Sequence, residues 1–480
     1  MLNRSLSTGD FPSRWKEACI FPTLKKGNVN AFSVTSYRPI SNLPVLSKLL
    51  EKVVSTQLLT YLNDCNLFPT FQSAYRPHHS AETVLLHLLS DIYKHLDKRH
   101  VSLLSFLDMS SAFDCVDHAI VLHRLRVSFG LSDVVIKWFT SFLHDRKFYV
   151  RHISSTKLVP LSYGVPQGSV LGPILFTLYI SELIPLVQNH DLCVHLFADD
   201  ILLYGFSSPQ NSNRLVSRIS SCISSVKEWL KSNRLLLNSE KTHLMWCHSP
   251  RLNCPFSTLP IHVDGSTLNP VKSVRYLGVV LDSNLSFSTN ISKTVSSCFS
   301  ALRRIRSIRS SITRQATVTL ITALVASRID YCIAAHAGLP STSLWRLQRV
   351  LHASARLVFR TKRHDSVSLL LRKLGWLSVS ARIQLRVASI AYLCNKGMAP
   401  SYLVRETTPV SSLRGRLRLR SASSDCFAAP LVRHPTLGGR AFAAVVAATW
   451  NRVPAEIKNS ESLQTFKICF KKFLLDLMHL

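Results

Sequence analysis

Acidic residues are scarce in this chain of 480 residues: 27 Asp and Glu stand against 58 Lys and Arg, and the formal net charge is +31. A surplus of this size indicates a polyanionic partner, either nucleic acid or an acidic membrane surface. Charge alone does not choose between them, because ribosomal, chromatin and membrane-surface proteins are also basic. Residues 285–480 carry 30 basic and 7 acidic side chains, or +23 of the total. The C-terminal part is therefore the better candidate for contact with a polyanion.

Closely spaced cysteines, a secretory leader and a spanning segment are also missing. The 12 cysteines stand singly, without a C-x-x-C pair or a cluster at zinc spacing, which predicts reduced thiols in an intracellular protein. Met1 is followed by Leu-Asn-Arg-Ser, so no signal peptide is expected. The uncharged stretch 158–181 could reach across a bilayer, but its glycines and prolines make a poor spanning helix. We therefore expect a protein of the cytoplasm or nucleus with no membrane contact.

Hydrophobic periodicity divides the chain near residue 285. Before this point, apolar residues at helical spacing alternate with short apolar runs that are typical of buried strands. Helices are predicted over 47–62, 81–96, 117–143, 173–186 and 211–230, and strands over 101–107, 194–204 and 271–281. After it, apolar residues from Ile291 to Ile308 step in threes and fours with arginines on the other faces, which predicts a basic amphipathic helix. The rest is predicted to be mainly helical, and we find no internal repeat and no coiled-coil heptads.

Three aspartates end or interrupt predicted strands. Asp108 closes the apolar run 101–107, and Asp199 and Asp200 lie between two further apolar runs. A charge among strand residues is costly unless it is compensated, and a carboxylate at a strand end can face a site where a cation compensates it. Mg²⁺ takes oxygen ligands of this kind, and two such ions roughly 3.5–4 Å apart can activate a 3′-hydroxyl and stabilise a leaving pyrophosphate. Taken alone, however, an Asp-Asp pair is more often a solvated turn.

A glycine-rich segment lies between the two acidic strands in the sequence. Residues 164–176 read Gly-Val-Pro-Gln-Gly-Ser-Val-Leu-Gly-Pro-Ile-Leu-Phe and open a predicted helix. Glycine permits close approach of the backbone, and the free N–H groups of a helix N-terminus suit a phosphate or a base-paired end. A lone segment of this kind is often only a tight loop, but its position between the acidic strands favours a functional role.

In this order, the motifs resemble the palm of LINE-type (non-long-terminal-repeat) retrotransposon reverse transcriptases. The palm motifs are 107–118, 164–173 and the Phe-Ala-Asp-Asp sequence at 197–200. Flanking segments resemble further motifs of the family: 11–26, 37–41, 72–80, 229–242 and 276–281. The resemblance therefore covers residues 11–285 in order. The tail is more weakly similar to the thumb and downstream helical segment, through 450–454 and Phe466-Lys.

The resemblance implies an α+β right-hand polymerase fold. Fingers and palm, the latter with an antiparallel sheet, are expected within 1–285, divided at about residue 100. A helical basic thumb is expected over 286–360, and a mainly helical C-terminal region with basic loops over 361–480. Members of the family usually carry an endonuclease upstream, whereas this chain begins almost at the first fingers motif, so we expect a truncated form that lacks it.

The resemblance also implies catalytic roles for individual residues. Asp108 and Asp199 would bind both metal ions, and Asp200 would support a metal or the primer end. Lys241 would protonate the leaving pyrophosphate, which is a general-acid role. Phe113 would lie under the sugar and exclude a 2′-hydroxyl, so that deoxynucleotides are favoured.

Substrate-binding roles are implied at further positions. Gln167 and Gly168 would line the nucleotide and template pocket, and Tyr276, Leu277 and Gly278 would lie near the primer grip. Lys25, Lys26 and Arg38 are candidates to hold triphosphate oxygens, although the lysines are equally consistent with a solvated pair. The basic run 414–420 would follow a phosphate backbone or form a flexible loop.

The function that the resemblance implies is RNA-directed DNA polymerase activity with two Mg²⁺ ions, Mn²⁺ being an alternative, and no other small-molecule cofactor. The expected partners are an RNA template, a DNA primer or target, and deoxynucleoside triphosphates. An inactive remnant that only binds nucleic acid stays open as an alternative. An RNA-directed RNA polymerase is disfavoured by Phe113 and the Phe-Ala-Asp-Asp sequence, and a chromatin protein would explain the charge but not the ordered motifs.

Overall fold

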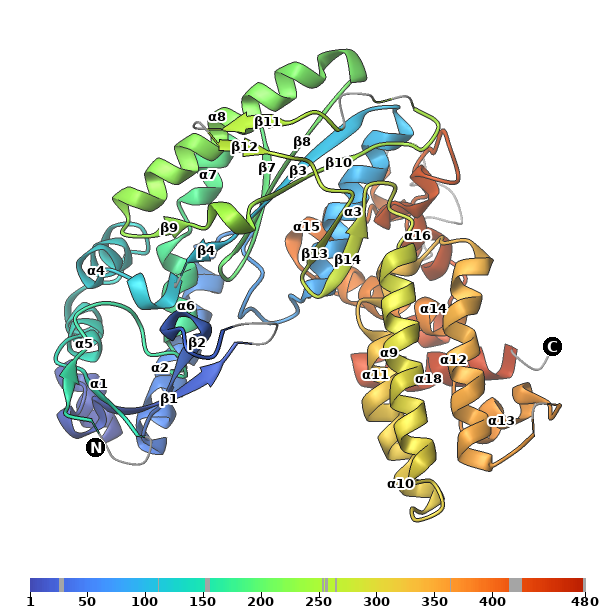
Figure 1. Cartoon of the computed structure of the whole chain (residues 1–480), viewed down its shortest axis with the longest axis horizontal. Helices are drawn as coiled ribbons and strands as arrows, with labels where there is room; N and C mark the ends of the chain where they lie inside the picture. The colour runs from blue at the N-terminus through green and yellow to red at the C-terminus, as the bar shows by residue number, and fades with distance from the viewer. Residues whose placement is uncertain are drawn as a thin grey trace.

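The computed structural model places strands in the part of the chain drawn from blue to yellow-green, followed by helices from yellow to red (Figure 1). The residues that the structure describes are 1–25, 30–110, 112–151, 156–252, 254, 258–263, 266–362, 364–413 and 425–477. Mixed α and β content and an antiparallel sheet are thus observed, as the sequence predicts.

The N-terminal sheet has four strands in the order β2-β1-β5-β6. Strand β1 (Glu17–Leu24) pairs antiparallel with β2 (Tyr37–Asn42) and parallel with β5 (Lys147–Val150), and β5 pairs with β6 (Val159–Pro160). Its neighbouring helices are α1 (Leu2–Thr8), α2 (Val45–Asp64) and α5 (Asp133–Leu143). Helix α2 contains the predicted helix 47–62.

The central sheet is antiparallel and has the order β10-β3-β8-β7. Its strands are β3 (Val101–Leu107), β7 (Cys193–Phe197), β8 (Asp200–Ser207) and β10 (His243–Cys247). All residues of β3 are buried, because both faces of the sheet are covered. Leu103 and Leu107 pack into a core on one face, whereas Leu104 and Phe106 pack into a second core on the other. A continuous apolar run is the pattern expected of a strand buried on both faces.

Helices from two parts of the chain cover the two faces. The first core contains residues of α4 (His118–Val127), α6 (Gly172–Tyr179), α7 (Leu183–Gln188) and α8 (Ser212–Ser232). The predicted helix 173–186 is two helices, because Pro185 has no N–H to donate to the preceding turn and is tolerated only near a helix start. The predicted helical segment 117–143 is likewise divided into α4 and α5, around Gly130 with φ +68°.

The second core runs from the central sheet into the C-terminal helices. It joins α3 (Ala81–Asp97) and the hairpin of β13 (Ser273–Tyr276) and β14 (Val279–Asp282) to residues as distant as Phe470 and Leu474. The C-terminal helices are α9 (Ser288–Ser307), α10 (Arg314–Ile321), α11 (Ser327–Asp330), α12 (Ser341–Phe359), α13 (Val367–Lys373), α14 (Val379–Asn395), α15 (Ser401–Val404), α16 (Phe442–Trp450), α17 (Ala455–Lys458) and α18 (Leu463–Leu477). The prediction of a mainly helical region after residue 285 is therefore confirmed for the described residues.

Helix α9 is the basic amphipathic helix that the periodicity predicts. Its buried side includes Ile291, Leu302 and Ile305, while arginines occupy exposed positions. Among the described residues, no helix combines the length and the apolar character needed to cross a bilayer.

Candidate active site

Strand register brings Asp108 beside the Asp199-Asp200 turn. Strands β3 and β8 pair with Leu107 opposite Ile201, so that Asp108, the next residue of the chain, lies beside Asp200 at the start of β8. Phe197 of β7 pairs with Asp200, which leaves Ala198 and Asp199 as a two-residue turn. Ala198 has φ +55°, the left-handed conformation that tight hairpins require at this position. The three predicted aspartates therefore lie at one end of the central sheet.

The three carboxylates are incompletely compensated. Burial, followed by the charges of Asp199 and Asp108, raises the pKa of Asp200 to about 6. Burial and the charge of Asp108 also raise the pKa of Asp199, although Arg38 and Lys241 act in the opposite direction. A raised carboxyl pKa means that the ionised form is less favourable in this environment than in water. This end of the sheet consequently has an excess of negative charge.

Lys241 is the cation that contacts the site directly. Its Nζ lies 2.9 Å from Asp108 Oδ2. The pairing of β4 (Met109–Ser110) with β9 (Leu236–Leu237), and an N–H bond of 2.8 Å from Asn238 to the Asp108 carbonyl, bring the Lys241 turn to the sheet. The lysine side chain is 65% exposed, so the ion pair is worth only about 0–1 kcal/mol and is easily exchanged.

A divalent cation fits the chemistry of these three carboxylates. The carboxylates are half-exposed and repel one another. In the described part of the chain, Lys241 is the one cation that forms an ion pair with them, and this pair is easily exchanged. Their oxygens are not all within 4.8 Å of one another; among the described residues, His87, Asp91 and Glu406 form the only group this close. That second group already has partners, because Lys94 pairs with Glu406 and Tyr204 Oη donates to Asp91 over 2.8 Å. The aspartate site is therefore the better fit to a cation.

A buried glutamine supports the aspartate turn from outside the sheet. Gln72 is fully buried, and its Oε1 accepts N–H bonds from Ala198 at 3.3 Å and Ala74 at 3.0 Å. The backbone on either side of Gln72 runs along β7. The Leu196 N–H donates to the Phe71 carbonyl over 2.8 Å, and the Ser73 N–H donates to the Leu196 carbonyl over 3.0 Å. Sequence reasoning noted the motif 72–80 but assigned this residue no role. The position of Gln72 at the start of the motif 72–80 was the one feature of the sequence that could have indicated this role.

Two glycines of the segment 164–176 lie where this segment closely approaches the backbone of another part of the chain. Gly168 has φ +126°, and a Cβ there would lie 2.5 Å from the carbonyl oxygen of Ser41 in β2. Gly164 has φ +83°, and its Cβ would lie 2.7 Å from the carbonyl oxygen of Asp114. Ser41 also donates its N–H to the Gln167 carbonyl over 2.7 Å. This segment thus joins the N-terminal sheet to the chain that follows Asp108.

The prediction of a free helix N-terminus after this segment is wrong. The carboxylate of Glu51 accepts the N–H groups of Val170 at 2.7 Å and Leu171 at 3.2 Å. Ser169 Oγ accepts the N–H of Gly172 at 2.9 Å. Buried N–H groups need a partner, and here α2 and the segment itself provide it. The start of α6 is consequently not open to a phosphate.

Further predicted nucleotide-site residues gather around Asp114. Gln167 Nε2 donates to Asp114 Oδ1 over 2.8 Å, and the charge of Lys25 opposes the rise in the Asp114 pKa that burial causes. Phe113, in the 3₁₀ turn Ala112–Cys115, is half-buried with its ring 4.6 Å from that of Phe176.

Arg38 is exposed on β2, and its charge reaches Asp199. It thus links the N-terminal sheet electrostatically to the aspartate site. Lys26 and the basic run 414–420 lie outside the described residues.

The predicted primer-grip residues form the turn between β13 and β14. Leu277 and Gly278 have φ +45° and +81°, and Tyr331 Oη donates to the Leu277 carbonyl over 2.8 Å. The Tyr276 ring lies 5.2 Å from that of Phe106 on the central sheet. Burial, and then the charge of Asp200, raises the pKa of Tyr276 well above its usual value. The hairpin therefore packs close to the aspartate site.

Comparison with known proteins gives a family match over this site. The family model for "Reverse transcriptase (RNA-dependent DNA polymerase)" matches residues 24–281, more than half of the chain. The "Probable RNA-directed DNA polymerase from transposon BS" of Drosophila melanogaster is 31% identical over 66% of this chain and 35% of its own length. The "RNA-directed DNA polymerase from mobile element jockey" of the same species is 29% identical over 61% of this chain and 31% of its own. The chain spans about a third of the length of these curated relatives.

Solved structures give more distant likenesses. Apo telomerase from Candida tropicalis has a TM-score of 0.42 at 12% identity, over 75% of this chain and 66% of that chain. The RNA-dependent RNA polymerase of a human picobirnavirus has a TM-score of 0.39 at 13% identity, over 76% and 63% respectively.

Proposed function

Because the chain belongs to the reverse transcriptase (RNA-dependent DNA polymerase) family, we propose that it extends a nucleic-acid 3′-hydroxyl along an RNA template with deoxynucleoside triphosphates. One observation carries the proposal: Asp108 and the Asp199-Asp200 turn meet at the end of the antiparallel sheet, inside the matched segment. The primer is DNA in this proposal, and the template enters as single-stranded RNA.

Divalent metal use is general in this family. We further propose that Asp108, Asp199 and Asp200 hold Mg²⁺, or Mn²⁺ in its place, at two positions. The bound metal would supply Lewis-acid stabilisation to the attacking hydroxyl and the leaving pyrophosphate. The three carboxylates would hold the metal ions in position. Lys241, whose Nζ lies 2.9 Å from Asp108, would leave this carboxylate and give its proton to the pyrophosphate.

The surrounding residues select and position the substrates in this proposal. Gln167 and Gly168 line the nucleotide and template side, and Phe113 presents its half-buried ring to the sugar so that a 2′-hydroxyl is excluded. Arg38 and Lys25 lie on the triphosphate side, where a guanidinium suits two phosphate oxygens at once. The Tyr276–Gly278 turn would hold the primer strand. The charge of Arg38 at Asp199, the charge of Asp200 at Tyr276, and the meeting of Gln167 and Lys25 at Asp114 support these roles.

Extension of a DNA primer on an RNA template tests the proposed function. We expect the purified chain to elongate oligo(dT) on poly(rA) with dTTP and Mg²⁺, to stop when the metal is chelated, and to use UTP poorly. The measurement is product length on a denaturing gel. Efficient use of UTP would favour an RNA polymerase. A folded protein that binds the hybrid but extends nothing would leave only a nucleic-acid-binding remnant.

Removing the acceptor at Gln72 should slow extension more than it weakens the fold. In Gln72→Ala, the Ala198 N–H loses its acceptor and the turn that carries Asp199 loosens. We expect the free energy of unfolding to fall by about 1–3 kcal/mol and the extension rate to fall roughly tenfold, measured at saturating dTTP. Gln57→Ala, at an exposed position of α2, is the matched control. Equal rates for the two variants would contradict a positioning role for Gln72.

A further inference from the structure

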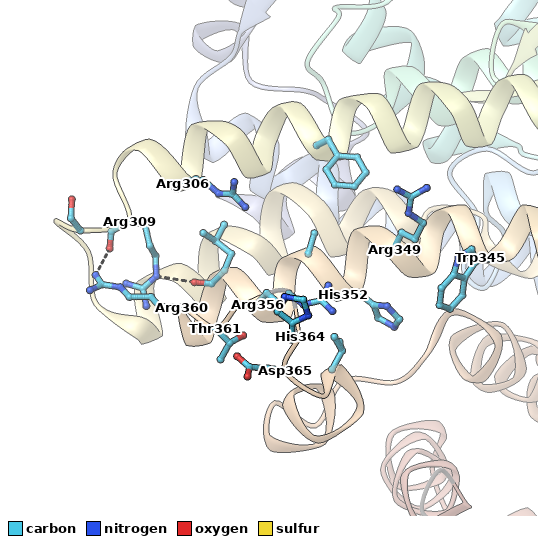
Figure 2. A pocket seen from close by; sticks show the side chains of 15 residues that line it. Arg306, Arg309, Trp345, Arg349, His352, Arg356, Arg360, Thr361, His364 and Asp365 are labelled. Carbon is cyan, nitrogen blue, oxygen red and sulfur yellow. Dashed lines mark hydrogen bonds between the residues drawn. The ribbon is translucent and has the colours of Figure 1, made fainter.

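A basic groove lies between α9 and α12, outside the aspartate site. This α9–α12 groove has a volume of about 1220 Å³. Its lining includes Arg306 from α9 and, from α12 and its end, Trp345, Arg349, His352, Arg356 and Arg360 (Figure 2). The proposed polymerase function uses none of these side chains.

The residues from α12 form one row along the helix. Positions 345, 349, 352, 356 and 360 are separated by three or four residues, so they lie on the same face. At a rise of 1.5 Å per residue the row extends over about 22 Å, and neighbouring members are separated by about 4.5–6 Å along the axis. Arg306 faces this row from α9 (Figure 2). An elongated ligand with regularly spaced negative charges fits this geometry.

The charge of the groove is largely uncompensated. None of the ion pairs found among the described residues involves Arg306, Arg349 or Arg360. Asp365 is the only acidic residue in the described lining, and its carboxylate accepts the N–H of Lys362 at 2.8 Å. Arg309 instead has a structural role, donating to the carbonyls of Leu357 at 3.1 Å and Val358 at 2.9 Å, and Arg360 Nη2 in turn donates to the Arg309 carbonyl over 2.8 Å. Several cations gathered around a single acid favour a polyanionic partner.

An aromatic side chain is exposed at one end of the row. Trp345 is 55% exposed, and its ring meets that of His352 edge to face at 5.4 Å. An exposed indole among arginines is the combination that binds single-stranded nucleic acid, because bases stack on the aromatic ring while cations meet the phosphates. In a duplex the bases are already stacked on one another, so a single strand fits better.

The groove lies on a different face of α9 from the surface near the aspartate site. Lys293, Arg304 and Arg328 line a recess on the other side of this helix. Lys293 and Arg328 also line the recess that includes Gly278 of the proposed primer grip. The α9–α12 groove shares no lining residue with either recess. A strand in the groove is therefore separate from a primer at the aspartates.

We propose that the α9–α12 groove is a second nucleic-acid site, which binds a single-stranded segment outside the strand being copied. Phosphates meet Arg306 and Arg349, and a base stacks on Trp345. The row accommodates on the order of four nucleotides. RNA and single-stranded DNA share this chemistry, and their relative affinities distinguish them. The proposal does not depend on polymerase turnover, because binding is measured without primer, nucleotide or metal.

Binding of labelled 12-nucleotide RNA and DNA of one sequence to the full chain, followed by fluorescence anisotropy, tests the proposal. We expect Arg306→Gln/Arg349→Gln to weaken binding by about 30-fold and to reduce the slope of log K against log salt by about 1.4. Arg214→Gln/Arg452→Gln removes the same charge at exposed positions elsewhere, and it should change affinity less than threefold. Trp345→Ala should weaken binding at least fivefold, whereas Trp345→Phe should retain most of the affinity.

Two results would overturn the proposal. If both double variants weaken oligonucleotide binding equally, the affinity comes from the overall positive charge of the chain and not from the groove. Displacement of the bound oligonucleotide by a short blunt RNA–DNA hybrid would place it at the aspartate site instead. If the groove variants alone weaken binding and the hybrid does not compete, the second site stands. Tighter binding of RNA or of DNA then identifies its ligand, and equal affinities mean that the groove does not read the 2′-hydroxyl.

Discussion

Asp199→Asn should abolish primer extension while leaving the fold as stable as before or more so. Asn keeps the shape of the side chain but removes the charge that we propose holds a divalent cation, so we expect the single-turnover rate to fall by on the order of 10³-fold or more. Asp108→Asn should have a similar effect, and it also removes the negative charge with which Lys241 pairs. Rapid-quench measurement of the first nucleotide addition gives the rate directly.

The expected gain in stability follows from the sign of the pKa shift. The folded-state pKa of Asp199 is raised, mainly by burial and then by Asp108, so the ionised carboxylate disfavours folding at neutral pH. A neutral amide removes that cost, and the melting temperature in the absence of metal should stay the same or rise. Asp64→Asn, at an exposed position of α2, is the matched control and should change neither property. A rate within tenfold of wild type for Asp199→Asn would refute the assigned metal-binding role.

Gly168→Ala should be the most destabilising glycine-to-alanine substitution in the glycine-rich segment. A Cβ at this position would lie 2.5 Å from the Ser41 carbonyl oxygen, and φ +126° is disfavoured for alanine. We expect the free energy of unfolding to fall by about 3 kcal/mol and extension to fall with it, because Gln167 moves away from β2. Thermal unfolding and primer extension measure the two effects.

Gly375→Ala separates backbone strain from the steric clash. Gly375 has φ +60°, but a Cβ added there would point into open space, with no atom of the described neighbouring residues within 4 Å. This variant should lose only about 1 kcal/mol. If Gly168→Ala is no more destabilising than Gly375→Ala, the close approach to Ser41 does not limit this position.

The order of motifs was enough to predict the architecture and the meeting of the aspartates. The run Val101–Leu107 is apolar almost throughout, so its strand could be delimited to the residue. The family match confirms the resemblance to LINE-type reverse transcriptases and, with it, the right-hand polymerase class. Strand register then follows from the hairpin, because only two residues separate Phe197 from Asp200.

Several side-chain contacts between residues distant in the sequence could not be predicted. Glu51 lies 119 residues before Val170, whose N–H it accepts, and nothing local to either residue indicates the contact. The support of Ala198 by Gln72 spans 126 residues in the same way. The groove between α9 and α12 required the helix pairing itself, because Arg306 and Arg349 are brought together only by tertiary packing.

The second core, which begins at the central sheet and ends in α18, makes the catalytic part of the chain dependent on a helix that lies far from it in the sequence. Phe470 and Leu474 belong to the same packed cluster as Leu104, Phe106 and Tyr204 of the sheet. A stop codon placed before α18 would spare every residue assigned to catalysis and still remove part of the cluster behind them. Selection for an active site therefore extends to apolar positions that never meet a substrate.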